Sequence, residues 1–218
     1  MKIKSQEIKY ILFDLDETLY PEETGLMAAV NQRIYDYMET RLRIDRSEVK
    51  GLRKKYYRQY GTTAQGLYLH HDLDMVDYQA YVHDVRVEDY LAPDLLLDGM
   101  LERMEAEKAI FTNSPVDYVR RVLRALGVER HFSHIFDIFF LGYINKPDKR
   151  AYLKVMEALR CEGRDCLLVD DLTRNLKPGK ELGMMTVLVG NPGDDEDKEM
   201  VDFTIPRVID LESIVDRP

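Results

Sequence analysis

A short stretch near the start of the chain decides its fold: Ile8-Lys9-Tyr10-Ile11-Leu12-Phe13-Asp14-Leu15-Asp16-Glu17-Thr18-Leu19-Tyr20. The run from Tyr10 to Phe13 is continuously apolar, which is typical of a strand buried on both faces of a parallel sheet. Asp14 and Asp16 follow two positions apart, so in an extended backbone both carboxylates leave on the same side. They repel each other, and a hard cation such as Mg²⁺ relieves that repulsion. A strand followed by an acidic surface turn is the simpler interpretation, so the rest of the chain must decide.

Composition limits the classes of function. The chain has 218 residues, enough for one domain with an insertion or for two small domains. Its net charge of −9 disfavours a nucleic-acid polymer or an anionic membrane surface as partner. The first six residues lack the apolar core of a signal peptide, and no run is long enough to span a bilayer. Two cysteines, Cys161 and Cys166, are too few for a disulfide framework, so we expect a cytoplasmic protein.

Residues 22–92 have the periodicity of helices and no convincing strand. Leu26, Val30, Ile34 and Tyr37 lie on one face of a predicted helix over about 24–42. Further helices are predicted over 47–60, 64–71 and 74–85, and Ala92-Pro93 ends the block. We therefore predict a helical insertion at residues 22–92 within a core formed by residues 1–21 and 93–218.

Strands and helices alternate after Asp94. The patterns predict strands at 108–112, 138–141, 166–169, 186–189 and 203–205, with helices at 95–106, 115–126, 147–159, 175–182 and 210–215. An acidic loop is expected at 194–199. Strands that alternate with helices indicate right-handed βαβ units, so the predicted fold class is α/β with a Rossmann-like open parallel sheet.

Polar residues follow four of the predicted strands: Asp14 with Asp16, Thr112-Asn113-Ser114, Lys146, and Asp170-Asp171. Ligands of open parallel sheets bind beyond the carboxyl ends of the strands, so these groups are expected to meet at one edge. Each group also has a simpler structural explanation. Thr112-Asn113-Ser114 can cap a helix, and Lys146-Pro147 can start a surface helix. Asp170-Asp171 can cap a helix or lie in a solvated loop. Their occurrence together favours a functional site.

The residue types suit the hydrolysis of a phosphate ester. Mg²⁺ bound by Asp14, by the backbone carbonyl of Asp16 and by the Asp170-Asp171 pair would neutralise the carboxylates. Lys146, the Thr112 hydroxyl and the Asn113 backbone N–H can bind phosphoryl oxygens. Asp14 is then the expected nucleophile, and Asp16 the expected acid that protonates the leaving oxygen and the base that later activates water.

These motifs resemble those of the haloacid dehalogenase (HAD) superfamily: Asp14-Leu15-Asp16-Glu17-Thr18, Thr112-Asn113-Ser114, Lys146-Pro147 and Val169-Asp170-Asp171. The resemblance covers the whole chain, and it implies that the helical insertion is a C1-type cap. It also implies that Asp171 binds Mg²⁺ directly while Asp170 acts through water. Dehalogenases of the superfamily lack the second Asp of the first motif, so the presence of Asp16 indicates phosphoryl chemistry.

A narrower resemblance is to the pyrimidine 5′-nucleotidase branch, whose members hydrolyse UMP and CMP. It rests on Leu15-Asp16-Glu17-Thr18-Leu19-Tyr20, on Tyr56-Tyr57-Arg58-Gln59-Tyr60-Gly61-Thr62-Thr63-Ala64-Gln65-Gly66-Leu67, and on Val169-Asp170-Asp171 with Asn175. It implies that Tyr60, Gly61 and His70 meet the base. Packing between cap helices is the alternative role for these tyrosines.

Three functions agree with the sequence. The first is a Mg²⁺-dependent phosphatase for pyrimidine nucleoside 5′-monophosphates. The second is the same chemistry on another small phosphate, such as phosphoglycolate or a sugar phosphate. The third is a non-catalytic binding protein of the same fold, which is disfavoured because every catalytic position holds a competent residue. The expected partner is a small phosphorylated metabolite.

Overall fold

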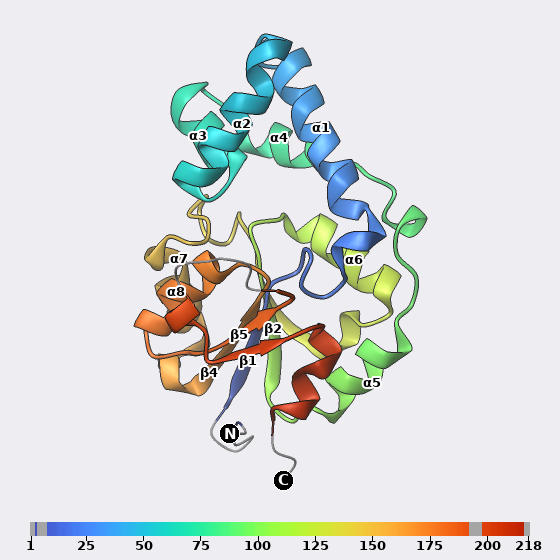
Figure 1. Ribbon diagram of the computed structural model, residues 1–218, viewed down its shortest axis with the longest axis vertical. Helices are drawn as coiled ribbons and strands as arrows, with labels where there is room; N and C mark the ends of the chain where they lie inside the picture. Colours follow the sequence, from blue (N-terminus) through green and yellow to red (C-terminus); the bar gives the residue numbers. More distant parts are fainter. Residues whose placement is uncertain (1–2, 4–7, 192–197, 216–218) are drawn as a thin grey trace.

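The computed structural model describes residue 3, residues 8–191 and residues 198–215. Most of the acidic loop predicted at 194–199 therefore lies outside the described residues. The described part forms a layered α/β body with a group of helices above one end of its sheet (Figure 1).

The sheet is parallel throughout and has the strand order β3-β2-β1-β4-β5-β6. Its strands are β1 (Tyr10–Phe13), β2 (Glu107–Phe111), β3 (Phe132–Phe136), β4 (Cys166–Asp170), β5 (Met185–Val189) and β6 (Phe203–Ile205). The chain winds outward from β1 on one side and from β4 on the other. The carboxyl ends of β1 and β4 therefore flank the point at which the winding direction changes, where such sheets bind ligands. The predicted fold class is confirmed.

Helices cover both faces of this sheet (Figure 1). Side chains alternate along β1, so Ile11 and Phe13 pack on one face with α5 (Leu95–Arg103) and α6 (Val116–Leu126). Leu12 packs on the other face with α7 (Lys149–Leu159) and α8 (Thr173–Glu181). Because both faces are buried, the central strands are apolar at consecutive positions, which is why they were recognisable in the sequence.

The strand predicted at 138–141 is wrong. Residues 138–141 form a turn, and the third strand is β3, Phe132–Phe136. The Asp137 carboxylate holds the turn, since it accepts from the backbone N–H groups of Phe140 at 2.8 Å and Val116 at 2.9 Å. Ile138 and Leu141 are nevertheless buried. The apolar run at 138–141 therefore reflects burial of a turn and not a strand. The edge strand β3 was not recognised because it carries the exposed polar residues Ser133 and His134.

Smaller differences concern helix ends. Helix α7 begins at Lys149, two residues later than predicted, because the Asp148 side chain caps it by accepting from the Arg150 N–H at 2.9 Å. Helix α8 begins at Thr173 rather than Asn175. The predicted closing helix is a 3₁₀ helix, Val208–Ser213. Other 3₁₀ turns lie at Glu22–Thr24, Val87–Asp89, Glu129–His131, Gly163–Asp165 and Lys198–Met200.

Two expectations about environment can be compared with the described residues. No helix among them is long and apolar enough to cross a membrane. Cys161 and Cys166 are free thiols, as expected from their small number.

Four helices connect β1 to α5: α1 (Leu26–Thr40), α2 (Arg46–Tyr60), α3 (Thr63–His70) and α4 (Met75–Val82). We call residues 26–82 the helical segment. It lies over the carboxyl ends of the strands (Figure 1) and encloses an apolar cluster of its own that includes Met38, Val49, Leu67 and Tyr78. Short polar residues cap three of these helices as capping rules predict: Asp45 for α2, Thr62 for α3, and Asp74 for α4, where it accepts from two N–H groups.

Gly66 permits the closest contact within this cluster. A Cβ atom at this position would lie 2.1 Å from Cγ of Tyr56. The Tyr56 ring is buried and its hydroxyl is bonded to Nε2 of His71 at 2.9 Å, so the ring has little freedom to move aside. Helices α2 and α3 can pack at this distance only with glycine at the contact.

We expect Gly66→Ala to lower the free energy of unfolding by about 1–3 kcal/mol, because the added methyl group overpacks the contact with Tyr56. Gly51→Ala is the matched control, since this glycine lies in the exposed middle of α2 with no atom within 4 Å of the added Cβ. It should instead stabilise the protein by about 0.5–1 kcal/mol through helix propensity. Urea denaturation of the two variants measures both effects, and equal stabilisation by both would refute the packing argument.

Candidate active site

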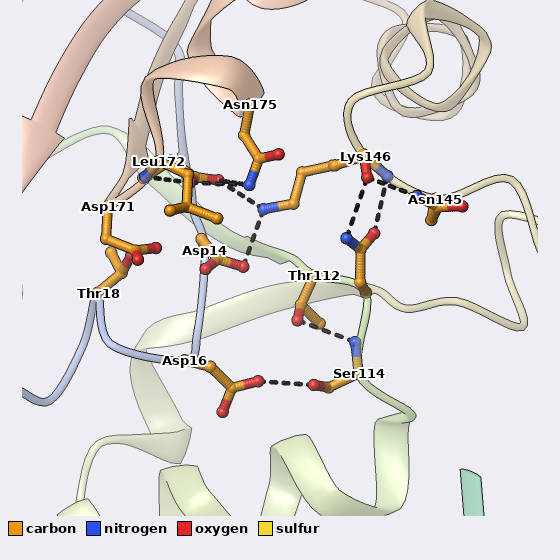
Figure 2. Close-up of polar contacts among 12 residues, drawn as sticks. Asp14, Asp16, Thr18, Thr112, Ser114, Asn145, Lys146, Asp171, Leu172 and Asn175 are labelled. Atoms are coloured by element: carbon orange, nitrogen blue, oxygen red, sulfur yellow. Dashed lines mark hydrogen bonds and ion pairs between the residues drawn. The ribbon is translucent and has the colours of Figure 1, made fainter. Parts of the chain in front are cut away.

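Lys146 lies at the centre of the polar groups at the carboxyl ends of the strands. Its Nζ is 2.8 Å from Oδ1 of Asp14 and 2.7 Å from Oδ2 of Asp170 (Figure 2). The lysine side chain is 1% exposed. Burial by itself would lower the pKa of Lys146, but the attraction of Asp14 and Asp170 outweighs burial and raises that pKa above its ordinary value. Lys146 is therefore a permanent buried cation beside Asp14.

Asp170, the last residue of β4, orients this lysine. Its carboxylate is fully buried and accepts from the Leu172 N–H at 2.9 Å and from Nδ2 of Asn175 at 3.0 and 3.2 Å, besides Lys146 (Figure 2). These donors come from the start of α8, directly after the strand. Asn175 thus acts on the site through Asp170.

The carboxylates of Asp14, Asp170 and Asp171 form an acidic cluster with ligand oxygens within 4.8 Å of one another. Burial, followed by the repulsion of Asp170 and Asp16, raises the pKa of Asp14 to about 7, against the opposing effect of Lys146. Burial and the repulsion of Asp170 and Asp14 raise the pKa of Asp171 to about 9. One lysine therefore does not compensate the cluster, and its hard oxygen donors fit Mg²⁺.

The Asp16 side chain points away from this cluster toward Ser114 (Figure 2). Three hydroxyl groups donate to it: Ser114 at 2.6 Å, Tyr20 at 2.5 Å and Tyr118 at 3.0 Å. Burial and then the Asp16 charge raise the pKa values of Tyr20 and Tyr118 well above their ordinary range, so both phenols stay protonated. Asp14 and Asp16 are thus two residues apart in sequence but lie in different environments.

Thr112 and Asn113 follow β2 and lie beside Lys146. The Thr112 hydroxyl accepts from the Ser114 N–H at 3.1 Å. The Asn113 side chain holds the Lys146 peptide, accepting from its N–H at 2.8 Å and donating to its carbonyl at 3.2 Å. Asn113 was expected to contribute only its backbone N–H, and the structure adds a positioning role for its side chain.

A cavity of about 180 Å³ joins these groups to the helical segment. At the core end it is lined by Asp14, Asp16, Thr112, Asn113, Lys146 and Asp171, which the structure brings together as expected for a parallel sheet. At the other end it is lined by residues of all four helices α1 to α4. The dimensions and linings suit a small molecule that has one end at the carboxylates.

Gly61 lines the cavity, whereas Tyr60 and His70 do not. Gly61 has φ of +84°, and a Cβ atom there would lie 2.6 Å from Cδ of Pro147, so glycine lets the end of α2 touch the loop that carries Lys146. Tyr60 instead bonds its hydroxyl to Nε2 of His70 at 2.6 Å on the exposed side of α2 and α3. The expected contact of both side chains with a bound ligand therefore has no support in their placement.

Arg174 of α8 and Asn145 attach the helical segment to the core. The Arg174 guanidinium donates to the carbonyls of Tyr57 and Gly61, both at 3.0 Å, and lies 3.9 Å from the centre of the Tyr57 ring. Nδ2 of Asn145 donates to the Tyr60 carbonyl at 2.9 Å.

Arg174 and Asn145 were not predicted as site residues from the sequence, and neither were the hydroxyl donors around Asp16. Arg174 lies one residue before Asn175 and Asn145 one residue before Lys146, so closeness to a motif was the available signal. Tyr20 and Tyr118 gave the same signal, lying four residues after Asp16 and Ser114 respectively.

Two curated relatives are similar to this chain. It is 26% identical to Phosphate metabolism protein 8 of Saccharomyces cerevisiae over 196 residues, which are 83% of this chain and 61% of that protein, so it spans less than two thirds of that relative. It is 24% identical to Glyceraldehyde 3-phosphate phosphatase of Methanocaldococcus jannaschii over an alignment of 232 residues, covering 95% of this chain and 97% of that protein.

Solved structures share the fold. A HAD phosphatase from Thermococcus onnurineus superposes with a TM-score of 0.65 at 24% identity, covering 95% of this chain and 97% of that one. An L-2-haloacid dehalogenase from Xanthobacter autotrophicus with covalently bound chloropropionic acid superposes with a TM-score of 0.60 at 16% identity. The superposition covers 94% of this chain and 96% of that one. The family model for haloacid dehalogenase-like hydrolases matches residues 8–183. Because this match includes β1, the helical segment and the acidic pair after β4, we conclude that the chain belongs to the haloacid dehalogenase-like hydrolases.

Proposed function

We propose that this protein is a Mg²⁺-dependent phosphatase that hydrolyses a small phosphomonoester through an aspartyl-phosphate on Asp14. One observation carries the proposal: Asp14 lies between the Lys146 cation and Asp171, while Asp16 is held apart by three hydroxyl donors. Two carboxylates in contrasting environments suit two different roles. Both relatives named above carry phosphate chemistry in their names, which supports the same conclusion.

The residues divide the reaction between them. Lys146, the Thr112 hydroxyl and the Asn113 N–H bind the phosphoryl oxygens. Lys146 occupies Oδ1 of Asp14, so Oδ2 is the oxygen that attacks phosphorus as the bond to the leaving oxygen breaks. Asp16 protonates that oxygen and then takes a proton from the water that hydrolyses the acyl phosphate. Asp14, the Asp16 carbonyl and Asp171 would hold Mg²⁺, with Asp170 acting through water, and the ion would supply the positive charge that lets a phosphate dianion approach the cluster.

We further propose that residues 22–92 form a C1-type cap on a catalytic core of residues 1–21 and 93–218. The helical segment has its own apolar cluster, and the cavity lies between it and the carboxylates. The cap therefore surrounds the leaving group while the core binds phosphate.

The cavity size favours a leaving group with a single ring or a short chain. A pyrimidine nucleoside, as in UMP or CMP, remains the first candidate from the sequence resemblance, with Gly61 rather than Tyr60 or His70 at the cavity wall. A short phosphorylated carbon chain, such as a sugar phosphate or phosphoglycolate, is the second. It is supported by similarity along nearly the whole chain to a protein named as a glyceraldehyde 3-phosphate phosphatase.

Asp14→Asn should lower kcat for p-nitrophenyl phosphate by at least about 10³-fold, because the amide cannot attack phosphorus. The matched control is Asp84→Asn, which makes the same change at an exposed carboxylate in a surface ion pair and should retain activity. Circular dichroism checks the fold of both. Near-wild-type turnover by folded Asp14→Asn would remove the nucleophile assignment.

Metal removal should abolish turnover, because the uncompensated carboxylates then repel a phosphate dianion. Activity is measured after exhaustive dialysis against EDTA and during titration with Mg²⁺. Asp171→Asn removes a direct ligand, so it should raise the Mg²⁺ concentration for half-maximal activity by at least the roughly 10–100-fold that the loss of an outer-shell partner costs. Asp170→Asn should mainly lower Tm, because it leaves Lys146 with one anionic partner. Full activity in EDTA would contradict the metal requirement.

Asp16→Asn tests the acid and base role separately. The p-nitrophenolate leaving group departs without a proton, so Asp14 should still be phosphorylated once, whereas hydrolysis of the acyl phosphate needs the base. Rapid mixing should therefore show a burst of about one equivalent of p-nitrophenolate followed by slow turnover. Asp14→Asn should show no burst. A fast steady state without a burst in Asp16→Asn would assign the base role elsewhere.

A further inference from the structure

Four buried side-chain atoms in the described part of the chain have no hydrogen-bond partner: Arg53 Nε, Gln65 Oε1, Gln79 Oε1 and Arg174 Nε. All four residues line the cavity that reaches Asp14 and Lys146. A buried polar atom without a partner costs about 1–3 kcal/mol, and folded proteins contain few of them. These residues gather around one cavity, so a molecule bound there would lie beside side chains that have unused hydrogen-bonding capacity.

Three of the four residues belong to the helical segment, each to a different helix: Arg53 to α2, Gln65 to α3 and Gln79 to α4. Gln79 is 4% exposed, and its amide nitrogen donates to the Met75 sulfur at 3.7 Å. Its oxygen is therefore an acceptor that solvent outside the cavity hardly reaches. Arg174 is different, because its other nitrogens attach α8 to α2.

The Arg53 guanidinium is oriented by neutral groups. It donates to the Tyr35 hydroxyl at 3.0 Å and to Oδ1 of Asn31 at 2.5 Å, and it lies 5.0 Å from the centre of the Tyr35 ring. None of the ion pairs among the described residues includes Arg53. Arg53 is thus a fixed, half-buried cation that lies at the cavity wall and has no carboxylate partner. Such a cation favours the binding of a ligand that presents an anionic or strongly polarised oxygen.

The cavity wall also contains apolar side chains such as Val30, Ile34 and Met75. An apolar wall with a few fixed polar groups is the usual form of a small-molecule site, in which the polar groups determine the orientation of the ligand. With the phosphate at Lys146, the rest of the substrate is the part that can meet these groups.

We propose that Arg53, Gln65 and Gln79 form the leaving-group site, which binds an sp² oxygen through Arg53 and a neighbouring O–H or N–H donor through the glutamine oxygens. This inference rests on the proposed phosphatase function and adds the chemistry of the substrate. Two kinds of leaving group have that pattern: a carboxylate beside a hydroxyl, as in a phosphorylated hydroxy acid, and a carbonyl beside an N–H, as in a pyrimidine. A plain alkyl or aryl group lacks it.

Two matched substrate pairs distinguish these two kinds of leaving group. 3-Phosphoglycerate and glycerol 3-phosphate differ in the carboxylate, and UMP and ribose 5-phosphate differ in the base. The wild-type protein should prefer the first member of one pair by at least tenfold in kcat/KM. The pair with the larger preference shows whether the leaving group is a hydroxy acid or a pyrimidine nucleoside. Absence of a tenfold preference in both pairs would overturn the inference.

Arg53→Met and Gln79→Leu should each reduce that preference at least fivefold, because each removes one polar group from the cavity wall. The controls are Arg58→Met and Gln59→Leu, the same changes at exposed positions of α2 that do not line the cavity. Both controls should keep the preference. If Arg53→Met and Gln79→Leu both keep the wild-type substrate preference, these side chains do not bind the leaving group and the proposal is overturned.

Binding provides a second measurement that does not depend on turnover. In the Asp14→Asn background, calorimetry with the preferred substrate and Mg²⁺ should show a Kd at least tenfold higher when Arg53→Met is added, with Tm reporting that both proteins are folded. An equal Kd in the two proteins would also overturn the proposal.

Phenyl phosphate separates failure of this inference from failure of the proposed function. It has an aryl leaving group, so its hydrolysis reports the core site alone. If the wild-type protein does not hydrolyse phenyl phosphate with Mg²⁺, or if Asp14→Asn hydrolyses it equally well, the phosphatase proposal fails and this inference fails with it. If hydrolysis depends on Asp14 but the substrate preferences are absent, only the leaving-group site is wrong.

Discussion

The buried ion pairs of Lys146 with Asp14 and Asp170 are the interaction on which the site depends. An ion pair in a protein interior recovers its desolvation cost only with good geometry and further hydrogen bonds. The chain supplies them from three directions: Asn113 holds the lysine peptide, Asn175 and the Leu172 N–H hold Asp170, and β1 fixes Asp14. Removing Lys146 would leave two buried carboxylates without their cation, and removing either carboxylate would take away one of the two anionic partners of the lysine. The residues that surround Asp14 are therefore also required for the stability of the core.

The same arrangement places two aspartates of one short loop in separate environments. Asp14 lies where the ends of β1 and β4 and the loop that carries Lys146 bring carboxylates and a lysine together, so its protonation depends on charges from several parts of the core. Asp16 is turned toward Tyr20, Ser114 and Tyr118, which are local to the first loop and to the start of α6. A rigid parallel sheet supports this division, because register between β1, β2 and β4 fixes the loops relative to one another.

The sequence predicted those features that depend on short stretches of chain. Central strands were recognisable as apolar runs, and polar residues after them could be assigned to one edge because parallel strands end together. Features that depend on contacts distant in sequence were not predictable. Strand β3 carries polar residues because it lies at a sheet edge, and the side chains of Tyr60 and His70 are hydrogen-bonded to each other outside the cavity. Arg53 and Gln79 resembled ordinary solvated helix residues until four helices were seen to place them around one space.

The attachment of α2 to the core has a consequence for the timing of substrate entry. Widening the cavity by moving α2 away would break the bonds from Arg174 to Tyr57 and Gly61 and from Asn145 to Tyr60. At about 0.5–1.5 kcal/mol for each bond, the loss of these three bonds alone would limit an opened form to roughly one molecule in ten or fewer. Asn145 is also the neighbour of Lys146 and contacts its carbonyl. The same displacement that admits a molecule would thus loosen the peptide of Lys146, so the cavity would open and the Lys146 ion pairs would be held firmly in alternation.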